Sequence, residues 1–125
     1  MDFALSPDQE SFVAEVRAFA RDHVAPRAAA IDAGGAFPRE LVRDAGRLGL
    51  MGMTVPAGRG GAGRDYVSYA LAVEAVAFAS ATLAVILTVN NSLVAEPLLE
   101  FGSAAQQEQW LARLASGTAI GAFAL

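Results

Sequence analysis

The sequence predicts an all-α protein whose helices form an up-and-down, bundle-like domain. Two S-x-x-Q capping boxes, Ser6–Gln9 and Ser103–Gln106, mark helix starts, because the serine hydroxyl caps the first turn and the glutamine reaches back to the cap. Between such signals, apolar residues recur at intervals of three and four, the spacing that places them on one helix face. Proline and glycine residues interrupt this pattern, as is typical of short helices joined by loops.

The first helix is predicted to begin at Ser6 and to run to about Ala25. Pro26 should stop or kink it, and the pair Gly34–Gly35 should end the short alanine-rich piece that follows. Its apolar residues recur on one face and its charged residues lie mostly on the others, so the apolar face is expected to pack into the core. The residues expected on that face are Phe12, Val16, Phe19 and Ala20, with Val13 and Val24 flanking them.

Three further helices are expected in the middle and second half of the chain. Pro38 opens one of them, and Asp65 caps the next. Ser80 caps a helix that should run from residue 81 to about residue 94, before Pro97 breaks the chain again.

The last part of the chain is expected to leave the helical pattern. A fifth helix should run from residue 103 to 115 and end before Gly117. From there to residue 125 the chain carries no charge, and its isoleucine and phenylalanine favour a strand. We therefore predict that these residues are the first residues of a β-strand.

The longest charge-free run, residues 75–95, is long enough to span a bilayer. Hydroxyl and amide side chains interrupt it, among them Thr88 and Asn90, and no basic residue flanks it. Ser80 should also divide it into two helices. The sequence therefore favours a pair of buried helices over a membrane span.

Composition excludes several classes of function. The chain has 125 residues, a net charge of -4 and nine basic residues, all arginine and scattered, which disfavours a nucleic-acid-binding surface. It has no cysteine and one histidine, so it offers no disulfide and no thiolate or multi-histidine metal site. This composition fits a reducing cytoplasm, and the first residues lack the basic region and apolar core of a signal peptide.

A glycine-rich run at residues 55–65, Val-Pro-Ala-Gly-Arg-Gly-Gly-Ala-Gly-Arg-Asp, places Gly58, Gly60 and Gly63 at the G-x-G-x-x-G spacing. A dinucleotide-binding loop of that pattern follows a buried strand, opens a helix and has an acidic residue about 20 positions later. Here Pro56 precedes the first glycine and the acidic residue is missing. The run is therefore not expected to bind a dinucleotide, and its role needs another explanation.

Polar side chains at three places could carry chemistry. Glu74 lies among apolar residues, so it should form an ion pair with an arginine or, as the less favoured alternative, act in catalysis. His23 is expected to be a solvated residue near the end of the first helix. The pair Asn90–Asn91 could line a polar pocket or tie its helix to a neighbour, because buried amides need several hydrogen bonds. No local motif assembles a set of catalytic groups or metal ligands, so no catalytic or metal-binding residue is assigned.

Several segments, in this order and spacing, resemble the acyl-CoA dehydrogenase family. Val-Asn-Asn-Ser-Leu at residues 89–93 is similar to the short-chain, butyryl-CoA type. The Leu5-Ser-Pro start and the glycine run also match, and the resemblance explains that run as a structural turn of the family. It covers all 125 residues. The other matching segments are Phe101-Gly-Ser103, Gln106-x-x-Gln-Trp110 and Gly117-x-x-Ile-Gly-x-Phe-Ala-Leu125.

This resemblance implies a domain organisation and a reaction. Residues 1–117 would be the N-terminal helical domain, and residues 118–125 the start of a middle β domain. A complete member also has a C-terminal helical domain, binds FAD between its domains and usually forms a homotetramer. It introduces an α,β double bond into an acyl-CoA, here expected to be short, as in fatty-acid β-oxidation. A glutamate removes the α-proton, and the β-hydrogen leaves as hydride to the flavin.

The resemblance also implies that this chain lacks the catalytic base, and it indicates the partners of the complete enzyme. In the family the catalytic glutamate belongs to the C-terminal domain, so the isolated chain is expected to be inactive. Reduced flavin passes its electrons to an electron-transferring flavoprotein. The expected form of the enzyme is a cytoplasmic homo-oligomer with no nucleic-acid or membrane partner.

Two groups of binding residues follow from the same resemblance. Phe123 and Leu125 match positions that lie against the flavin. A second group matches the helix that borders the acyl-chain slot, although ordinary core packing produces the same apolar spacing. That group consists of Val85, Ile86, Val89, Asn90 and Leu93.

A function of a different class stays open, namely a non-enzymatic helical binding or assembly module with this fold. Without the other domains, the chain should expose an apolar face, and its last residues should form an unpaired strand edge. Both features predict that the isolated chain associates with itself.

Overall fold

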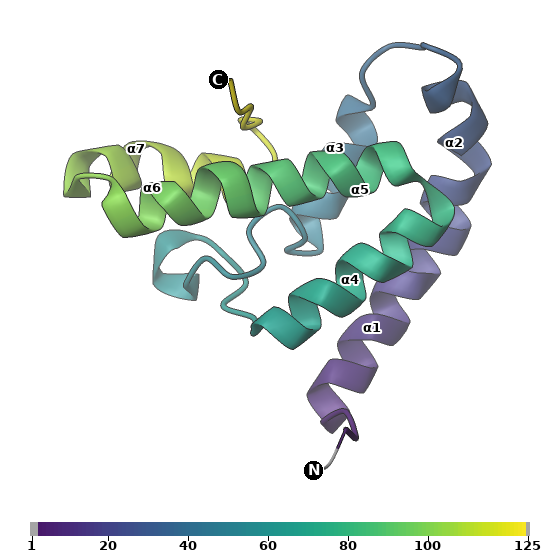
Figure 1. The fold of residues 1–125 in the computed structure, drawn as a ribbon, viewed down its shortest axis with the longest axis horizontal. Helices are drawn as coiled ribbons and strands as arrows, with labels where there is room; N and C mark the ends of the chain where they lie inside the picture. The colour runs from purple at the N-terminus through teal and green to yellow at the C-terminus, as the bar shows by residue number, and fades with distance from the viewer. Residues whose placement is uncertain (1–2, 125) are drawn as a thin grey trace.

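The computed structural model describes residues 3–124, and within that part of the chain all regular elements are helical. Figure 1 shows two long helical stretches, one formed by α1 and α2 and the other by α5 and α6, with α4 running between them. The helices and their bounds are α1 (Pro7–Phe19), α2 (Ala25–Asp32), α3 (Arg39–Arg47), α4 (Tyr66–Ala79), α5 (Ala81–Thr88), α6 (Glu96–Phe101) and α7 (Ala104–Ala115).

The predicted helix starts are confirmed by their caps. Both capping boxes form: Ser6 Oγ accepts from the Gln9 amide at 3.2 Å, and the Ser103 box is built in the same way. Asp65 caps α4 by accepting from the Ser68 amide at 2.7 Å, and this hydrogen bond lowers the pKa of the Asp65 carboxyl. Ser80 caps α5, so it divides the charge-free run into two helices as predicted.

Pro97 does not break the helix, so that prediction is wrong; Pro26 likewise does not stop the first helical stretch. A π-helical turn precedes each proline, at Ala20–Val24 and at Val89–Ala95. In a regular α-helix the proline ring clashes with the carbonyl four residues earlier. The wider π-turn inserts an extra residue there, so the helix continues past the proline.

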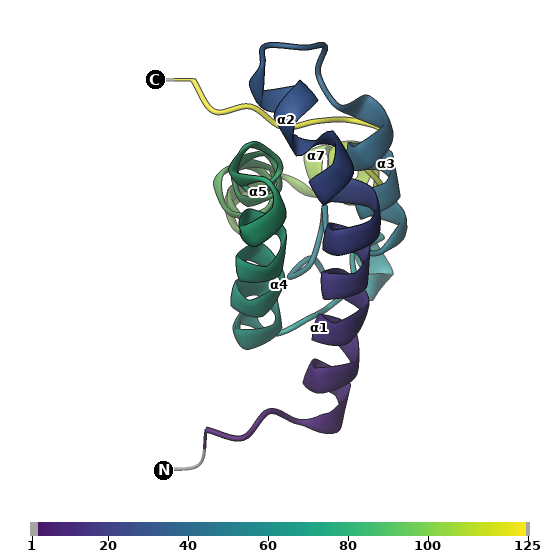
Figure 2. The ribbon, with the colours of Figure 1, turned by 90° about the vertical axis from the view of Figure 1, so that its right-hand side faces the viewer.

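The main core lies between two sets of helices. Figure 2 shows α4 and α5 on one side of the molecule and α1 and α3 on the other, with α2 above them. The four residues predicted on the apolar face of the first helix and the two predicted to flank it are all buried. The largest fully buried side chains of this core also come from α3, from the chain just after it and from α5: Leu41, Leu50, Met51, Met53, Leu83 and Leu87.

The continuous helix from Ala81 to Phe101 is long and apolar enough to cross a membrane by length and composition alone. About a third of its most apolar window is buried inside the structure. Leu83 and Leu87 on this helix belong to the main core. The buried helix of a globular domain meets the same length and composition criteria.

The expected strand after Gly117 does not form among residues 118–124. A strand is stabilised by hydrogen bonds to a neighbouring strand, and the described chain offers no such neighbour. Instead, this segment leaves the end of α7 and runs over the continuous helix Ala81–Phe101, which is called the long helix below (Figures 1 and 2). Leu125 lies outside the described residues.

Candidate functional site

The glycine run forms a closed structural loop, as the sequence predicts. Each backbone amide from Arg59 to Arg64 donates to a backbone carbonyl within residues 52–57, including Gly63 to Val55 at 2.9 Å. Gly60 adopts a left-handed conformation with φ 86° and approaches α7 so closely that an added Cβ would lie 2.9 Å from the Cβ of Ala112. These amides are taken up inside the loop and are not free to hold a phosphate.

Asn91 ties the long helix to the chain that enters this loop. Its side chain is buried, and its Oδ1 accepts from the Met53 amide at 2.8 Å. Its Nδ2 donates to the Leu50 carbonyl at 2.8 Å and to the Leu87 carbonyl at 2.9 Å. One side chain therefore satisfies backbone groups on two segments that are about forty residues apart in the sequence.

Asn90 connects the same helix to three other places. It is 0% exposed, and its Nδ2 donates to the Met51 carbonyl at 2.7 Å and to the Leu114 carbonyl at 3.3 Å. Its Oδ1 accepts from the Gly121 amide at 2.8 Å. The interpretation that the asparagine pair ties its helix to neighbouring segments is confirmed.

The five residues expected along the acyl-chain slot separate into two groups. Val85 is 61% exposed and Leu93 is 44% exposed, with half-buried Val89 between them at helical spacing. Ile86 packs against the main core, and Asn90 is fully buried. The stripe of Val85, Val89 and Leu93 is at least partly accessible to a ligand, whereas Ile86 and Asn90 lie beneath it.

An apolar groove of about 540 Å³ begins at Leu93. It runs between α6, the C-terminal half of α7 and the segment after Gly117, with Leu93 as the one member of the predicted acyl group in its lining. The other apolar side chains that line it include Val94, Leu98, Phe101, Trp110, Leu114 and Ile120.

Phe123 is the described residue that the resemblance places against a flavin. Its ring is 55% exposed, and no hydrogen bond joins the backbone of residues 122–124 to the rest of the described chain. An accessible aromatic ring and unpaired backbone donors and acceptors fit the edge of a flavin, which has apolar ring surface and polar ring atoms. Leu125, the other residue of this prediction, is not among the described residues.

Two of the polar candidates do not behave as expected. Glu74 lies on the exposed side of α4 and forms no ion pair within residues 3–124, because its neighbours Val73 and Val76 are the residues that face the core. The expected ion pair is therefore wrong. His23 is exposed, but its helix continues to Asp32, so it does not lie at a helix end; it stacks on Phe19 with ring centroids 5.8 Å apart.

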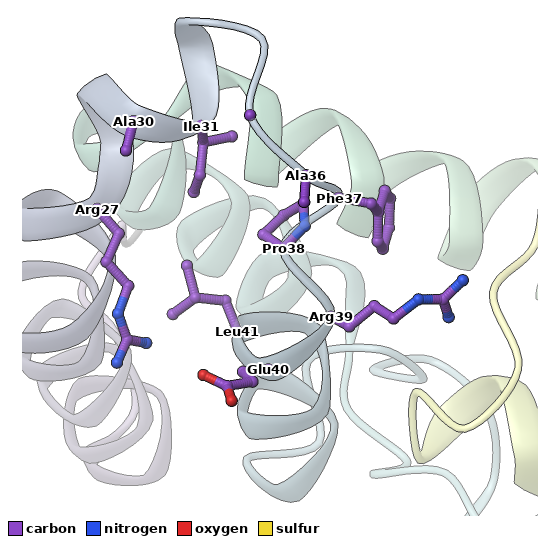
Figure 3. A pocket seen from close by; sticks show the side chains of 10 residues that line it. Arg27, Ala30, Ile31, Ala36, Phe37, Pro38, Arg39, Glu40 and Leu41 are labelled. Carbon is purple, nitrogen blue, oxygen red and sulfur yellow. The ribbon is translucent and has the colours of Figure 1, made fainter.

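A further pocket, of about 390 Å³, lies between α2 and the start of α3 (Figure 3). The side chains of Ile31, Pro38 and Leu41 line its centre. Arg39 extends away from it beside Phe37, with its guanidinium carbon 5.8 Å from the ring centroid. Arg27 and Glu40 also line this pocket. Within the described chain, no group of three or more histidine, aspartate and glutamate side chains could hold a metal.

Comparison with known proteins gives these surfaces their context. The profile of the family described as "Acyl-CoA dehydrogenase, N-terminal domain" matches residues 6–118. The chain belongs to this family. Its sequence is 45% identical to the short-chain specific acyl-CoA dehydrogenase of mouse mitochondria over 109 residues, which is 87% of this chain and 26% of that protein. The all-α N-terminal domain expected from the sequence is thereby shown.

Solved structures of acyl-CoA dehydrogenases have the same fold. Butyryl-CoA dehydrogenase from Megasphaera elsdenii superimposes with a TM-score of 0.86 at 35% identity, covering 96% of this chain and 32% of the other. A glutaryl-CoA dehydrogenase from Mycobacterium smegmatis in complex with FADH2 gives a TM-score of 0.87 at 33% identity, covering 93% of this chain and 30% of the other. This acyl-CoA dehydrogenase domain thus spans about a third or less of its relatives.

Proposed function

We propose that the chain is the N-terminal helical domain of a flavin-dependent acyl-CoA dehydrogenase that acts on short acyl chains. The family match over residues 6–118 is the observation that carries this proposal. The likeness to a short-chain specific relative and to a butyryl-CoA dehydrogenase supports the short acyl chain.

Within such an enzyme, the stripe Val85, Val89 and Leu93 forms one wall of the acyl-chain slot. All three side chains are apolar and accessible, so they remove an alkyl chain from water without desolvating a polar group. Ile86 and Asn90 hold the stripe in place, because Ile86 packs into the core and Asn90 bonds to three backbone groups. In this proposal, the catalytic base of the complete enzyme is not one of the 125 residues of this chain.

Phe123 and the backbone around it form an edge of the FAD site. FAD would supply the hydride acceptor for the β-hydrogen of the substrate. The proposal also includes Leu125 as a second residue at the FAD site. It further includes an electron-transferring flavoprotein as the electron acceptor, a homo-oligomeric enzyme and a cytoplasmic location. These come from the resemblance in the sequence and from its lack of cysteine.

Ligand titration of the 125-residue chain by methyl NMR tests the acyl wall. Butyryl-CoA should shift the methyl signals of Val85, Val89 and Leu93, whereas free CoA should shift them much less, because the stripe contacts the alkyl chain. Val67 is an exposed valine on α4 and serves as the internal control. Equal responses to the two ligands, or shifts centred on Val67, would show that this stripe is not the acyl wall.

A flavin measurement tests the other half of the proposal. After incubation with FAD and desalting, or during titration at high FAD concentration, signals of residues 122–124 should change because they form the edge of the cofactor site. FAD-induced changes confined to other parts of the chain would contradict the assignment of Phe123.

The alternative function, a helical assembly module, is supported by one exposed surface. Phe78 on α4 is 97% exposed and lies beside an apolar hollow lined by Ala75 and Ala79, with Arg17 and Glu74 at its edge. Opposite charges on one surface allow two copies to pair symmetrically, each Arg17 facing the Glu74 of the other copy. We therefore expect a second copy of the chain to bind here.

Sedimentation velocity tests this expectation. The chain should show a concentration-dependent dimer that Phe78→Ser abolishes, since each dimer loses two buried aromatic rings. Phe101→Ser removes an exposed phenylalanine from α6 and should leave the dimer intact. A chain that stays monomeric at high concentration would contradict the assembly function.

A further inference from the structure

The chain after α7 is held against the long helix at one residue, Gly121. Its amide donates to Asn90 Oδ1 at 2.8 Å. A Cβ added to Gly121 would lie 2.7 to 2.8 Å from three side-chain atoms of Val94, which is closer than real Cβ atoms approach. Figure 1 shows this segment beside the middle of the long helix, which Figure 2 views end-on. Gly121 therefore combines a specific hydrogen bond with an approach that leaves no room for a side chain.

The Asn90 amide has only one favourable orientation. Its Nδ2 faces the carbonyls of Met51 and Leu114, and its Oδ1 faces the amide of Gly121. Flipping the amide would place oxygen against two carbonyl oxygens and an NH2 group against a donor. Since Met51 and Leu114 are buried and lie in two different parts of the fold, Asn90 presents a preoriented acceptor to the segment that crosses it.

Phe123 lies two positions after Gly121, and the residue before Gly121 is also anchored. Ile120 packs against the main core. Two residues of extended chain reach at most about 7 Å, so fixing Gly121 restricts the region in which the Phe123 backbone lies. The chain after Gly121 forms no hydrogen bond with the described rest of the molecule, so Gly121 is its last polar attachment.

We propose that Asn90 and Gly121 form a clamp that fixes where the chain leaves the helical domain, which makes Asn90 a positioning residue for the segment carrying Phe123. The connection to a flavin rests on the proposed function, but the clamp itself does not. From the sequence, Asn90 was expected at the acyl-chain slot. In this proposal Asn90 positions the segment at the edge of the FAD site through its hydrogen bond with the Gly121 backbone, and it does not contact the ligand.

Amide exchange and ¹⁵N relaxation of the 125-residue chain test the clamp. Gly121→Ala should speed exchange of the residue-121 amide by about tenfold or more and make residues 121–124 mobile, because the new Cβ meets Val94 and the hydrogen bond to Asn90 is lost. Amides in α1, α4 and α5 should keep their protection. Asn90→Ala should loosen the same residues, but it also leaves the Met51 and Leu114 carbonyls unpaired, so Gly121→Ala is the cleaner variant.

A rescue variant separates the clamp from general damage. Val94→Gly removes all three side-chain atoms that the new Cβ would meet, so Gly121→Ala combined with Val94→Gly should restore both slow exchange and an ordered segment. Val94→Gly alone should leave the segment ordered. A rigid segment in Gly121→Ala, or a double variant as mobile as the single one, would overturn the clamp.

FAD titration of the same variants separates this proposal from the proposed function. Loosening of residues 121–124 in Gly121→Ala should weaken the FAD-induced shifts at residues 122–124, and the rescue variant should restore them. A mobile segment with undiminished FAD shifts would overturn the positioning role while leaving the proposed function in place. If FAD causes no shift in the unmodified chain, the flavin assignment of Phe123 fails, and the relaxation data still decide the clamp.

Discussion

Replacing Asn91 with alanine should lower the free energy of unfolding of the domain by about 3–5 kcal/mol. Each buried polar group that loses its hydrogen-bond partner costs about 1–3 kcal/mol of stability. The Met53 amide loses its acceptor, and the carbonyls of Leu50 and Leu87 each lose a donor. A domain of this size is stable by only about 5–15 kcal/mol, so the variant should be near the limit of folding. Urea unfolding followed by circular dichroism measures the difference.

Ser92→Ala is the matched control for this prediction. Ser92 follows Asn91 directly, but its hydroxyl only donates to the Thr88 carbonyl one turn earlier in its own helix. Its removal should change stability by about 0.5 kcal/mol or less, since no second segment depends on it. A loss below about 1 kcal/mol for Asn91→Ala would mean that water replaces the amide, and the tie between helix and loop would not be a main source of stability.

Gly61→Ala should destabilise the glycine loop by about 1–3 kcal/mol, the usual range for overpacking. A Cβ at this position would collide with the carbonyl and the side chain of Val55. Val55 is fully buried in the smaller core cluster with Ala95 and Leu111, so it has little freedom to move aside. Thermal unfolding should show a lower midpoint with unchanged helical content at low temperature.

Gly58→Ala provides the control from the same loop. Nothing lies within 4 Å of a Cβ at Gly58, and its φ is not positive, so alanine should be neutral or stabilising by up to about 1 kcal/mol. A phosphate-binding loop would give a different pattern, because Gly58 is the first glycine of the G-x-G-x-x-G spacing. Equal losses in the two variants would contradict the purely structural role of the loop.

Local chemistry explains why the helix starts could be predicted from the sequence. A capping box needs only residues three positions apart, so Ser6 and Ser103 are recognisable without knowledge of the fold. The same holds for Asp65 and Ser80. The buried face of the first helix followed from its periodicity, because all residues on one side of an amphipathic helix share the same environment.

Each error has a physical reason in the backbone geometry or the packing of the folded chain. Pro97 was expected to break its helix, but the packed helix accommodates the proline through a π-turn. Glu74 was expected to need a partner because apolar residues surround it in the sequence, but only the packing of α4 decides which side of that helix faces water. A strand was expected near Phe123, but a strand forms only where a second strand is available.

The sequence by itself determined the all-α class and the helix starts, because short-range spacing encodes them. It also determined the resemblance to acyl-CoA dehydrogenases, which explained the glycine run as a structural loop. Tertiary structure alone decided what the asparagine pair holds and which of the five predicted acyl-slot residues are accessible. Asn90 bonds to carbonyls of Met51 and Leu114 and to the amide of Gly121, and no local pattern specifies such partners. Backbone groups of this kind come together only when the helices pack, so their pairing is a property of the fold.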